Sequence, residues 1–240
     1  MGVHTARSLP PNGRRRAVVL AGGRRDYVMT AAGLGAHSVA GVLLAGGLSR
    51  RMGGGDKALA NLGGITLLQR VIDRAKPQVS ALAINANGDP ARFAIYGLPV
   101  IPDVIDGFAG PLAGVLTGLE WAAEQAPDCT WLASFATDAP FIPHNLVARL
   151  LDAIHDQSAD MACAASGGRH HPVFGLWPVA LRGELRRAVF DEEVRKVDRW
   201  TARYRLAVAD FATEPVDPFF NANRPDDLAE AEALLAKAPA

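Results

Sequence analysis

The sequence contains few of the features that mark secreted, membrane or zinc-binding proteins. It has only two cysteines, Cys129 and Cys163, and no Cys-x-x-Cys pair, which argues against a zinc ribbon or a thioredoxin-type site. No apolar run approaches 18 residues, so no membrane-spanning helix is predicted. A chain of 240 residues buries an adequate core without disulfides. Both cysteines lie in apolar runs and are therefore predicted to be buried thiols in a reducing, cytoplasmic setting.

The chain also lacks net charge, because its 25 basic residues match its 25 acidic ones. This balance argues against a nucleic-acid-binding protein, which would carry a basic surface. The balance hides an uneven distribution, since residues 1–40 hold six Arg and one Asp, a net charge of +5. The remaining 19 basic and 24 acidic residues give residues 41–240 a net charge of −5.

The first 40 residues are rich in Arg, Gly and small side chains and show no sustained helical or strand period. We expect a flexible N-terminal tail over 1–40 and a single domain over 41–240. The tail contains AVVLAGGRR at 17–25, which resembles GVLLAGGLSRR at 41–51. Only the second copy is followed by alternating strand and helix patterns, so we place the functional loop there.

From residue 41 onward, apolar strand patterns alternate with helical patterns. This alternation predicts an α/β protein with a mostly parallel sheet and helices on both faces, whose ligands bind beyond the carboxyl ends of the strands. Strands are predicted at Gly41–Ala45, Ala81–Asn85, Val100–Ile101, Cys129–Ala136, Asp160–Ala165, Pro172–Trp177 and Arg205–Phe211. Helices are predicted at Thr66–Ala75, Leu112–Gln125, Asn145–His155, Gly183–Phe190, Val194–Arg203 and Pro225–Ala236.

A glycine-rich loop follows the first predicted strand and reads LAGGLSRRMGGGDK over residues 44–57. Glycines let successive backbone N–H groups approach an anion closely, and Arg51 and Lys57 add cations that phosphates need. The loop is not a Walker A motif, because its Lys follows Asp56 and is not followed by Ser or Thr. It therefore predicts a phosphate-binding loop of a different kind.

Acidic and amide side chains follow three further predicted strands. Asp138 ends the apolar strand before Pro140, where a carboxylate commonly holds Mg²⁺ that in turn binds phosphate. Asn85 and Asp103 each end a short strand and are suited to hydrogen-bond a base or ribose, although an Asx turn explains either residue in isolation. Gly110 opens a helix whose first N–H groups are suited to an anion or a base.

The chain from Arg195 onward contains further polar residues whose spacing does not identify one particular function. Arg195 and Lys196 form a short basic cluster that suits a second anionic ligand or a solvated surface, and Asn221 and Asn223 precede the last helix. Asn223 suits a metal shell or a helix cap equally well. No Ser-His-Asp arrangement with a nucleophile elbow is present, so a covalent mechanism is not indicated.

These motifs together resemble those of the molybdenum cofactor guanylyltransferases. The resemblance rests on LAGGLSRRMGGGDK (44–57), NAN (85–87), GPLAG (110–114), TDAP (137–140) and NANRPDDL (221–228) and covers residues 41 to about 235. It implies a three-layer, Rossmann-like fold of the glycosyltransferase-A type within the nucleotidyltransferases. It further implies Mg²⁺-dependent transfer of GMP from GTP to the phosphate of molybdenum-bearing molybdopterin, with release of pyrophosphate.

The resemblance also implies roles for particular residues. Catalysis is assigned to Arg51, Lys57 and Asp138, with Asp138 holding the metal. The nucleotide-binding residues are Leu44, Ala45, Gly46, Gly47, Lys57, Asn85, Asp103, Gly110 and Asp138. The second substrate is assigned to Arg195, Lys196, Asn221 and Asn223. GTP and molybdopterin are the expected partners, with transient contacts to molybdoenzymes or other cofactor-synthesis proteins, and neither nucleic acid nor membrane is expected.

Three alternatives remain open at this stage. Relatives that use CTP tend to carry Ala-Ala-Gly where this chain has Ala45-Gly46-Gly47, which favours GTP. Sugar-phosphate nucleotidyltransferases are usually longer than this chain. A non-catalytic nucleotide-binding protein would have been favoured by loss of Lys57 or Asp138, and both are present.

Overall fold

The computed structural model describes residues 17–19, 28–30, 38–46, 57–105 and 110–235 of the chain. The chain divides into two units, Met1–Leu34 and Gly35–Ala240. In the first unit, strand β1 (Ala17–Val19) pairs with strand β2 (Val28–Thr30) in antiparallel register. Each of these two strands spans three residues.

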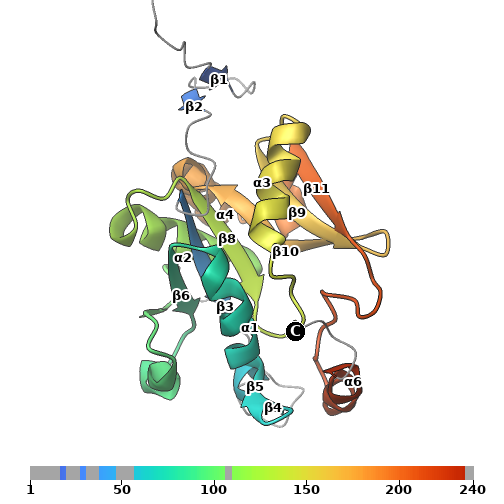
Figure 1. The fold of residues 1–240 in the computed structure, drawn as a ribbon. Helices are drawn as coiled ribbons and strands as arrows, with labels where there is room; N and C mark the ends of the chain where they lie inside the picture. The colour runs from blue at the N-terminus through green and yellow to red at the C-terminus, as the bar shows by residue number, and fades with distance from the viewer. Residues whose placement is uncertain (1–16, 20–27, 31–37, 47–56, 106–109, 236–240) are drawn as a thin grey trace, which may run out of the picture. The chain divides into compact units, whose positions relative to one another are not determined.

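A seven-stranded sheet organises the second unit (Figure 1). Its strands follow the order β11-β9-β10-β8-β3-β6-β7, and every neighbouring pair is parallel except the two pairs that β10 makes with β9 and β8. The sheet is therefore mostly parallel, as predicted. The strands are β3 (Val39–Leu44), β6 (Ala81–Asn85), β7 (Val100–Ile101), β8 (Trp131–Ala136), β9 (Met161–Ser166), β10 (Arg169–Pro178) and β11 (Leu206–Phe211).

Strand β3 begins at Val39, two residues before the predicted start. The extension arises because the chain is paired on both sides here: Ser80 N–H donates to the Val39 carbonyl at 2.9 Å, and Thr130 N–H donates to the Ser38 carbonyl at 2.9 Å. The strand lies between β6 and β8 and is buried along almost its whole length. It is thus an interior strand whose end is aligned with the ends of β6 and β8.

Helices cover both faces of this sheet (Figure 1). Thr66 caps the first helix by accepting a hydrogen bond from Gln69 N–H at 3.1 Å, a contact worth about 1 kcal/mol in typical helices. The helices are α1 (Leu67–Ala75), α2 (Pro111–Gln125), α3 (Leu146–Asp156), α4 (Arg182–Phe190), α5 (Val197–Thr201) and α6 (Pro225–Leu235). Shorter elements include β4 (Asn61–Leu62), β5 (Ile65–Thr66) and a 3-10 helix at Pro90–Tyr96.

One predicted helix is shorter than expected. We predicted a helix over Val194–Arg203, whereas α5 spans only Val197–Thr201. The difference arises at the end of α4, where Glu193 adopts a left-handed φ of 52° and Val194 N–H donates back to the Ala188 carbonyl at 2.9 Å. This arrangement caps α4, so the following residues cannot begin another helix at once.

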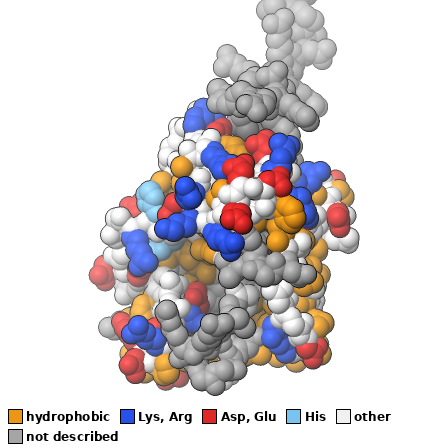
Figure 2. All heavy atoms as spheres, turned by 180° about the vertical axis from the view of Figure 1, so that it is seen from behind, with side chains coloured by type: hydrophobic (Ala, Val, Ile, Leu, Met, Phe, Trp, Pro, Cys, Tyr) orange, Lys and Arg blue, Asp and Glu red, His pale blue; other side chains and the backbone are white. Residues whose placement is uncertain are grey.

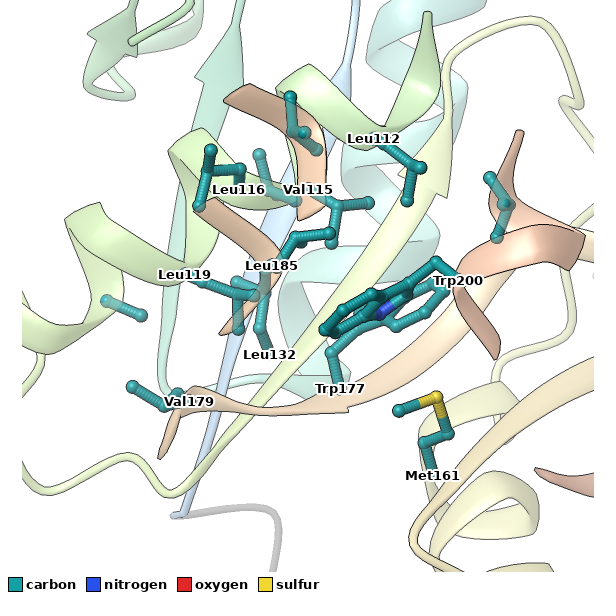
Figure 3. Close-up of a cluster of buried hydrophobic side chains, with 14 of the residues drawn as sticks. Leu112, Val115, Leu116, Leu119, Leu132, Met161, Trp177, Val179, Leu185 and Trp200 are labelled. Atoms are coloured by element: carbon teal, nitrogen blue, oxygen red, sulfur yellow. The ribbon is translucent and has the colours of Figure 1, made fainter. Parts of the chain in front are cut away.

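The main hydrophobic core on one face joins α2, α4 and α5 to the sheet (Figure 3). Trp177 of β10 and Trp200 of α5 lie in this cluster and are each 1% exposed. The Trp177 indole N–H is satisfied by Ser134 Oγ at 2.8 Å, so the large side chain is buried without an orphaned donor. This packing fixes α2, whose amino end lies at the site described below.

A second, smaller core holds the C-terminal helix. It unites Leu62 of β4 and Leu67 of α1 with Phe141, Val216, Ala222 and Ala231, which is fully buried in α6. The segment immediately before α6 is therefore held by apolar packing of Val216 and Ala222 within it and of Ala231 in the helix that follows. On the face shown in Figure 2, the described basic and acidic side chains are interspersed.

Candidate active site at the carboxyl edge of the sheet

The carboxyl ends of four parallel strands lie side by side. Leu44, the last residue of β3, is in register with Asn85 of β6 on one side and with Ala136 of β8 on the other. Ile101 of β7 is in register with Asn85 in turn. Residues that follow these strands are therefore gathered at one edge, where parallel α/β sheets bind their ligands.

Asn85 and Asp103 are brought into direct contact at this edge. Asn85 is buried, and its Nδ2 donates to Asp103 Oδ1 at 2.9 Å and to the Ile101 carbonyl at 3.2 Å. Our interpretation of these two residues as a joint feature thus has a geometric basis. Asn87 of the NAN motif joins them, because its Nδ2 donates to Asp103 Oδ2 at 2.8 Å.

Helix α2 begins beside this group. Gly110 precedes Pro111 with a φ of +151°, a conformation that L residues rarely adopt. One turn later, Gly114 lies so close to the strand ends that a Cβ there would be 2.4 Å from Asn85 Oδ1 and 2.6 Å from Leu44 Cδ2. Glycine at 114 therefore lets the helix approach Asn85, a requirement that the sequence pattern did not indicate.

Lys57 and Asp138 form the charged part of the site. Lys57 Nζ lies 2.7 Å from Asp138 Oδ2 and also donates to Asn223 Oδ1. Both charged side chains are largely shielded, with 17% and 27% of their surface exposed. Residues from the glycine-rich loop, the end of β8 and the segment before α6 thus converge on one ammonium group.

The segment that carries Asn223 is held by backbone contacts. Ala222 N–H donates to the Asp138 carbonyl at 2.9 Å, which joins this segment to the end of β8. Asp227, in the first turn of α6, accepts from the N–H groups of Asn223 at 2.7 Å and Arg224 at 2.8 Å. An acid three residues after the N-cap position, here Arg224, is a known capping signal, so Asp227 was detectable from the sequence.

The other predicted residues are distributed as follows. Ala45 is buried and Gly46 exposed directly after β3. Arg195, Lys196 and Asn221 are exposed, and the position of a Gly110 Cβ would lie 3.5 Å from the Arg195 carbonyl oxygen. Gly47 and Arg51 lie outside the described residues.

A hydrogen-bonded cluster lies where β10 begins. His171 Nε2 contacts Ser166 Oγ at 2.8 Å, and the same hydroxyl donates to Asp217 Oδ1 at 2.9 Å. The His171 ring packs on Phe219 with centroids 4.6 Å apart, while His170 is exposed. Burial lowers the pKa of His171 below its ordinary value, against the opposing charge of Asp217. The two histidines therefore have different surroundings, as expected for neighbours on a strand.

Within the described ranges, no group of three His, Cys, Asp or Glu side chains is arranged to hold a metal. Asp138 and Asn223 nevertheless present a carboxylate and an amide oxygen to a single cation, the Lys57 ammonium. No helix in the described part of the chain is long and apolar enough to cross a membrane. Both cysteines are buried and unpaired, and burial raises the pKa of Cys163 to about 11.

Sequence comparisons place this chain beside nucleotide-transferring proteins. The model of the MobA-like NTP transferase domain matches residues 41–207. A molybdenum cofactor guanylyltransferase of Rhodopseudomonas palustris is 61% identical over 82% of this chain and 92% of its own length. A protein of the same name from Bradyrhizobium is 57% identical over 83% of this chain and 94% of its own length.

Solved structures support the same fold. A molybdopterin-guanine dinucleotide biosynthesis protein A from Archaeoglobus fulgidus aligns with a TM-score of 0.64 at 22% identity, over 82% of this chain and 99% of that one. A CMP:2-keto-3-deoxy-manno-octonic acid synthetase complexed with CTP aligns with a TM-score of 0.61 at 14% identity, over 83% and 98%. At these identities the likeness concerns the fold alone, which occurs in proteins acting on different nucleotides.

Proposed function

The chain belongs to the molybdenum cofactor guanylyltransferase family, with its MobA-like NTP transferase domain, and on that premise we propose how its site performs the reaction. The chain transfers GMP from GTP to the phosphate of molybdenum-bearing molybdopterin. The observation that carries this proposal is the convergence of Lys57, Asp138 and Asn223 next to the aligned ends of β3, β6 and β8.

The reaction needs little covalent participation from the protein. A phosphate oxygen of molybdopterin attacks the α-phosphorus of GTP, and the bond from that phosphorus to the bridging oxygen of the β-phosphate breaks. The products are the guanine dinucleotide and pyrophosphate. Because the attacking phosphate is already ionised at neutral pH, no general base is required, and catalysis depends on positioning and charge neutralisation.

Lys57 is the principal cation of the described site. Its ammonium is held by Asp138 and Asn223 beside the strand ends, within the region where the phosphates of a bound nucleotide would lie. We assign Lys57, together with Arg51, to neutralise charge on the α-phosphate and the departing pyrophosphate. Leu44, Ala45, Gly46 and Gly47 would contact the nucleotide through their backbone, as glycine-rich loops do.

Asp138 and Asn223 fit a divalent cation. A carboxylate oxygen and an amide oxygen are hard donors of the kind Mg²⁺ prefers, and both already face one positive charge. We assign Asp138 as the metal ligand, with Asn223 beside it. Bound there, Mg²⁺ would supply further neutralisation of the phosphate oxygens during transfer.

The remaining assignments concern guanosine and the second substrate. Asn85 and Asp103 face the nucleoside, with Gly110 leading into the helix beside them. Arg195, Lys196 and Asn221 supply exposed polar groups near this edge for molybdopterin. We expect transient contacts with molybdoenzymes, and a cytoplasmic location, where the two unpaired thiols would stay reduced.

The nucleotide preference is the most direct test of this function. Thermal shift and calorimetry with Mg²⁺ and GTP, CTP, ATP or UTP should show tight binding and stabilisation by GTP alone. A ligand that binds only the native state stabilises it by an amount that grows with the logarithm of the ligand concentration over its Kd, so the two readouts should rank the nucleotides in the same order. A preference for CTP would indicate cytidylyl transfer, the alternative that the Ala45-Gly46-Gly47 sequence disfavours.

A further inference from the structure

The amide of Asn85 has only one possible orientation. Its Nδ2 lies 2.9 Å from a carboxylate oxygen of Asp103 and 3.2 Å from the Ile101 carbonyl. Both partners are acceptors without a proton, so the nitrogen must face them and both of its protons are used. What Asn85 can still offer a ligand is the oxygen, Oδ1.

That oxygen lies close to the backbone of two glycines. A Cβ at Gly114 would lie 2.4 Å from Asn85 Oδ1, and one at Gly46 would lie 3.8 Å from it. Asn85 is 3% exposed, and within the described ranges no donor contacts Oδ1. Because Oδ1 has no donor among the described residues and is not among the fully buried atoms that lack a partner, it can accept a hydrogen bond from a ligand.

Asn87 fixes the neighbouring carboxylate at two points. Its Nδ2 donates to Asp103 Oδ2 at 2.8 Å, and its Oδ1 accepts from the Asp103 backbone N–H at 2.8 Å. Here too the orientation is forced, since a carboxylate only accepts and an N–H only donates. Each oxygen of Asp103 therefore receives one amide proton and keeps lone-pair capacity for a further donor.

We propose that Asn87 is a positioning residue that determines nucleotide selection, by holding Asp103 and through it Asn85 as a pair that offers only acceptors. Such a pair complements a ligand edge that offers only donors. Guanine presents its N1–H and 2-amino group side by side, and ribose presents two hydroxyls, whereas the corresponding edge of cytosine has one amino donor beside two acceptors. This proposal rests on the proposed function and assigns its selectivity to a residue that does not itself contact the nucleotide.

The test compares Asn87→Ala and Asn87→Asp with the wild-type chain. Asn87→Asp keeps an acceptor for the Asp103 N–H but sets a carboxylate against Asp103 Oδ2, so it should weaken binding more than Asn87→Ala. The control is Asn61→Ala, which removes another exposed Asn with a single side-chain bond, to Gly64 N–H. Calorimetry with Mg²⁺ and GTP, inosine triphosphate (no 2-amino group) or 2′-deoxyGTP measures the affinities.

For Asn87→Ala we expect GTP affinity to fall about tenfold, because the Asp103 carboxylate loses the amide group that orients it. The KM for GTP should rise while kcat stays near the wild-type value, and Asn61→Ala should change neither. A smaller loss for inosine triphosphate than for GTP would place the donors on the base. A smaller loss for 2′-deoxyGTP would place them on the ribose.

Two results would overturn the proposal: unchanged GTP affinity in Asn87→Ala, or equal losses for all three nucleotides with a lowered melting temperature, which would indicate a merely structural role. These results are distinct from failure of the proposed function. If the wild-type chain shows no preference for GTP over CTP, the function itself is contradicted. If that preference exists and Asn87→Ala binds GTP as tightly as the wild-type chain, only the role of Asn87 is wrong.

Discussion

Lys57 Nζ lies 2.7 Å from Asp138 Oδ2, although the two residues are 81 positions apart in the chain. The same ammonium contacts Asn223, 166 positions further along than Lys57. The fold thus brings one ammonium group and two acceptor oxygens together at the ends of β3 and β8.

Replacing Lys57 with Ala should lower turnover by at least about 100-fold, the usual cost of losing one preorganised charge-stabilising donor. The effect should appear in kcat, because the ammonium acts most strongly on charge that develops during transfer. Steady-state assay of pyrophosphate release measures it. Lys76→Ala, at an exposed position at the end of α1, is the matched control and should be unaffected. Near-normal turnover in Lys57→Ala would contradict the assigned role.

The same contact predicts an opposite effect on metal binding. In the nucleotide-free protein the Lys57 ammonium faces the oxygens that would hold the cation. Lys57→Met should therefore bind Mn²⁺ several-fold more tightly than the wild-type chain, as like charges repel. Asp138→Asn should bind it more weakly. Electron paramagnetic resonance of free Mn²⁺ reports both without any turnover. Weaker Mn²⁺ binding in Lys57→Met would contradict the shared position.

Two helical glycines provide a paired test of packing at the site. Gly114→Ala places a Cβ 2.4 Å from Asn85 Oδ1 and 2.6 Å from Leu44 Cδ2, so we expect a loss of about 1–3 kcal/mol in unfolding free energy and weakened GTP binding. Gly183→Ala, in α4, has nothing within 4 Å of the new Cβ and should be neutral or stabilising by up to about 1 kcal/mol. Urea unfolding and calorimetry compare the two, and equal stability of both variants would refute the close approach.

The partly buried position of His171 predicts a pH dependence of stability. Burial lowers the pKa of His171 in the folded chain below its ordinary value of 6.5, so between the two values the unfolded chain binds more protons. Stability is then present above pH 6.5 and falls as the pH drops toward the lowered value. His171→Gln should lose less unfolding free energy than the wild type between pH 7.5 and pH 5. Parallel pH profiles of the two proteins would show that His171 contributes nothing.

The first unit, Met1–Leu34, carries none of the assigned residues. A chain that begins at Gly35 keeps Ser38 and Val39, whose carbonyls pair with Thr130 and Ser80. We expect it to bind GTP with the affinity of the full chain, as calorimetry would show. A folded truncated chain that no longer binds GTP would mean that the N-terminal segment takes part in the site.

Much of the fold could be predicted from local pattern. Ala81–Asn85 and Val100–Ile101 form strands at the expected residues, because apolar runs flanked by turn residues leave little choice of boundary. The antiparallel course of β10 was not predicted. It follows from Gly167 and Gly168, whose φ values of 53° and 75° match a two-residue hairpin turn between β9 and β10. The Gly-Gly pair was the available signal.

The site was predictable strand by strand but not as a whole. Residues at strand ends could be named because parallel strands share one ligand edge, and Asn85, Asp103 and Asp138 do lie there. The contact of Lys57 with Asn223 depends on how α6 packs against α1 and β4, which no local pattern encodes. The two-point contact of Asn87 with Asp103 likewise needs the spacing of two adjacent strands.

The central claim is guanylyl transfer by this chain. The most direct measurement is transfer of label from GTP or CTP, each radiolabelled at the α-phosphate, to molybdenum-bearing molybdopterin with Mg²⁺ present. Label from GTP should appear in a dinucleotide product together with one equivalent of pyrophosphate, and CTP should give no labelled dinucleotide. Transfer from CTP in preference to GTP, or release of pyrophosphate without labelled dinucleotide, would contradict it.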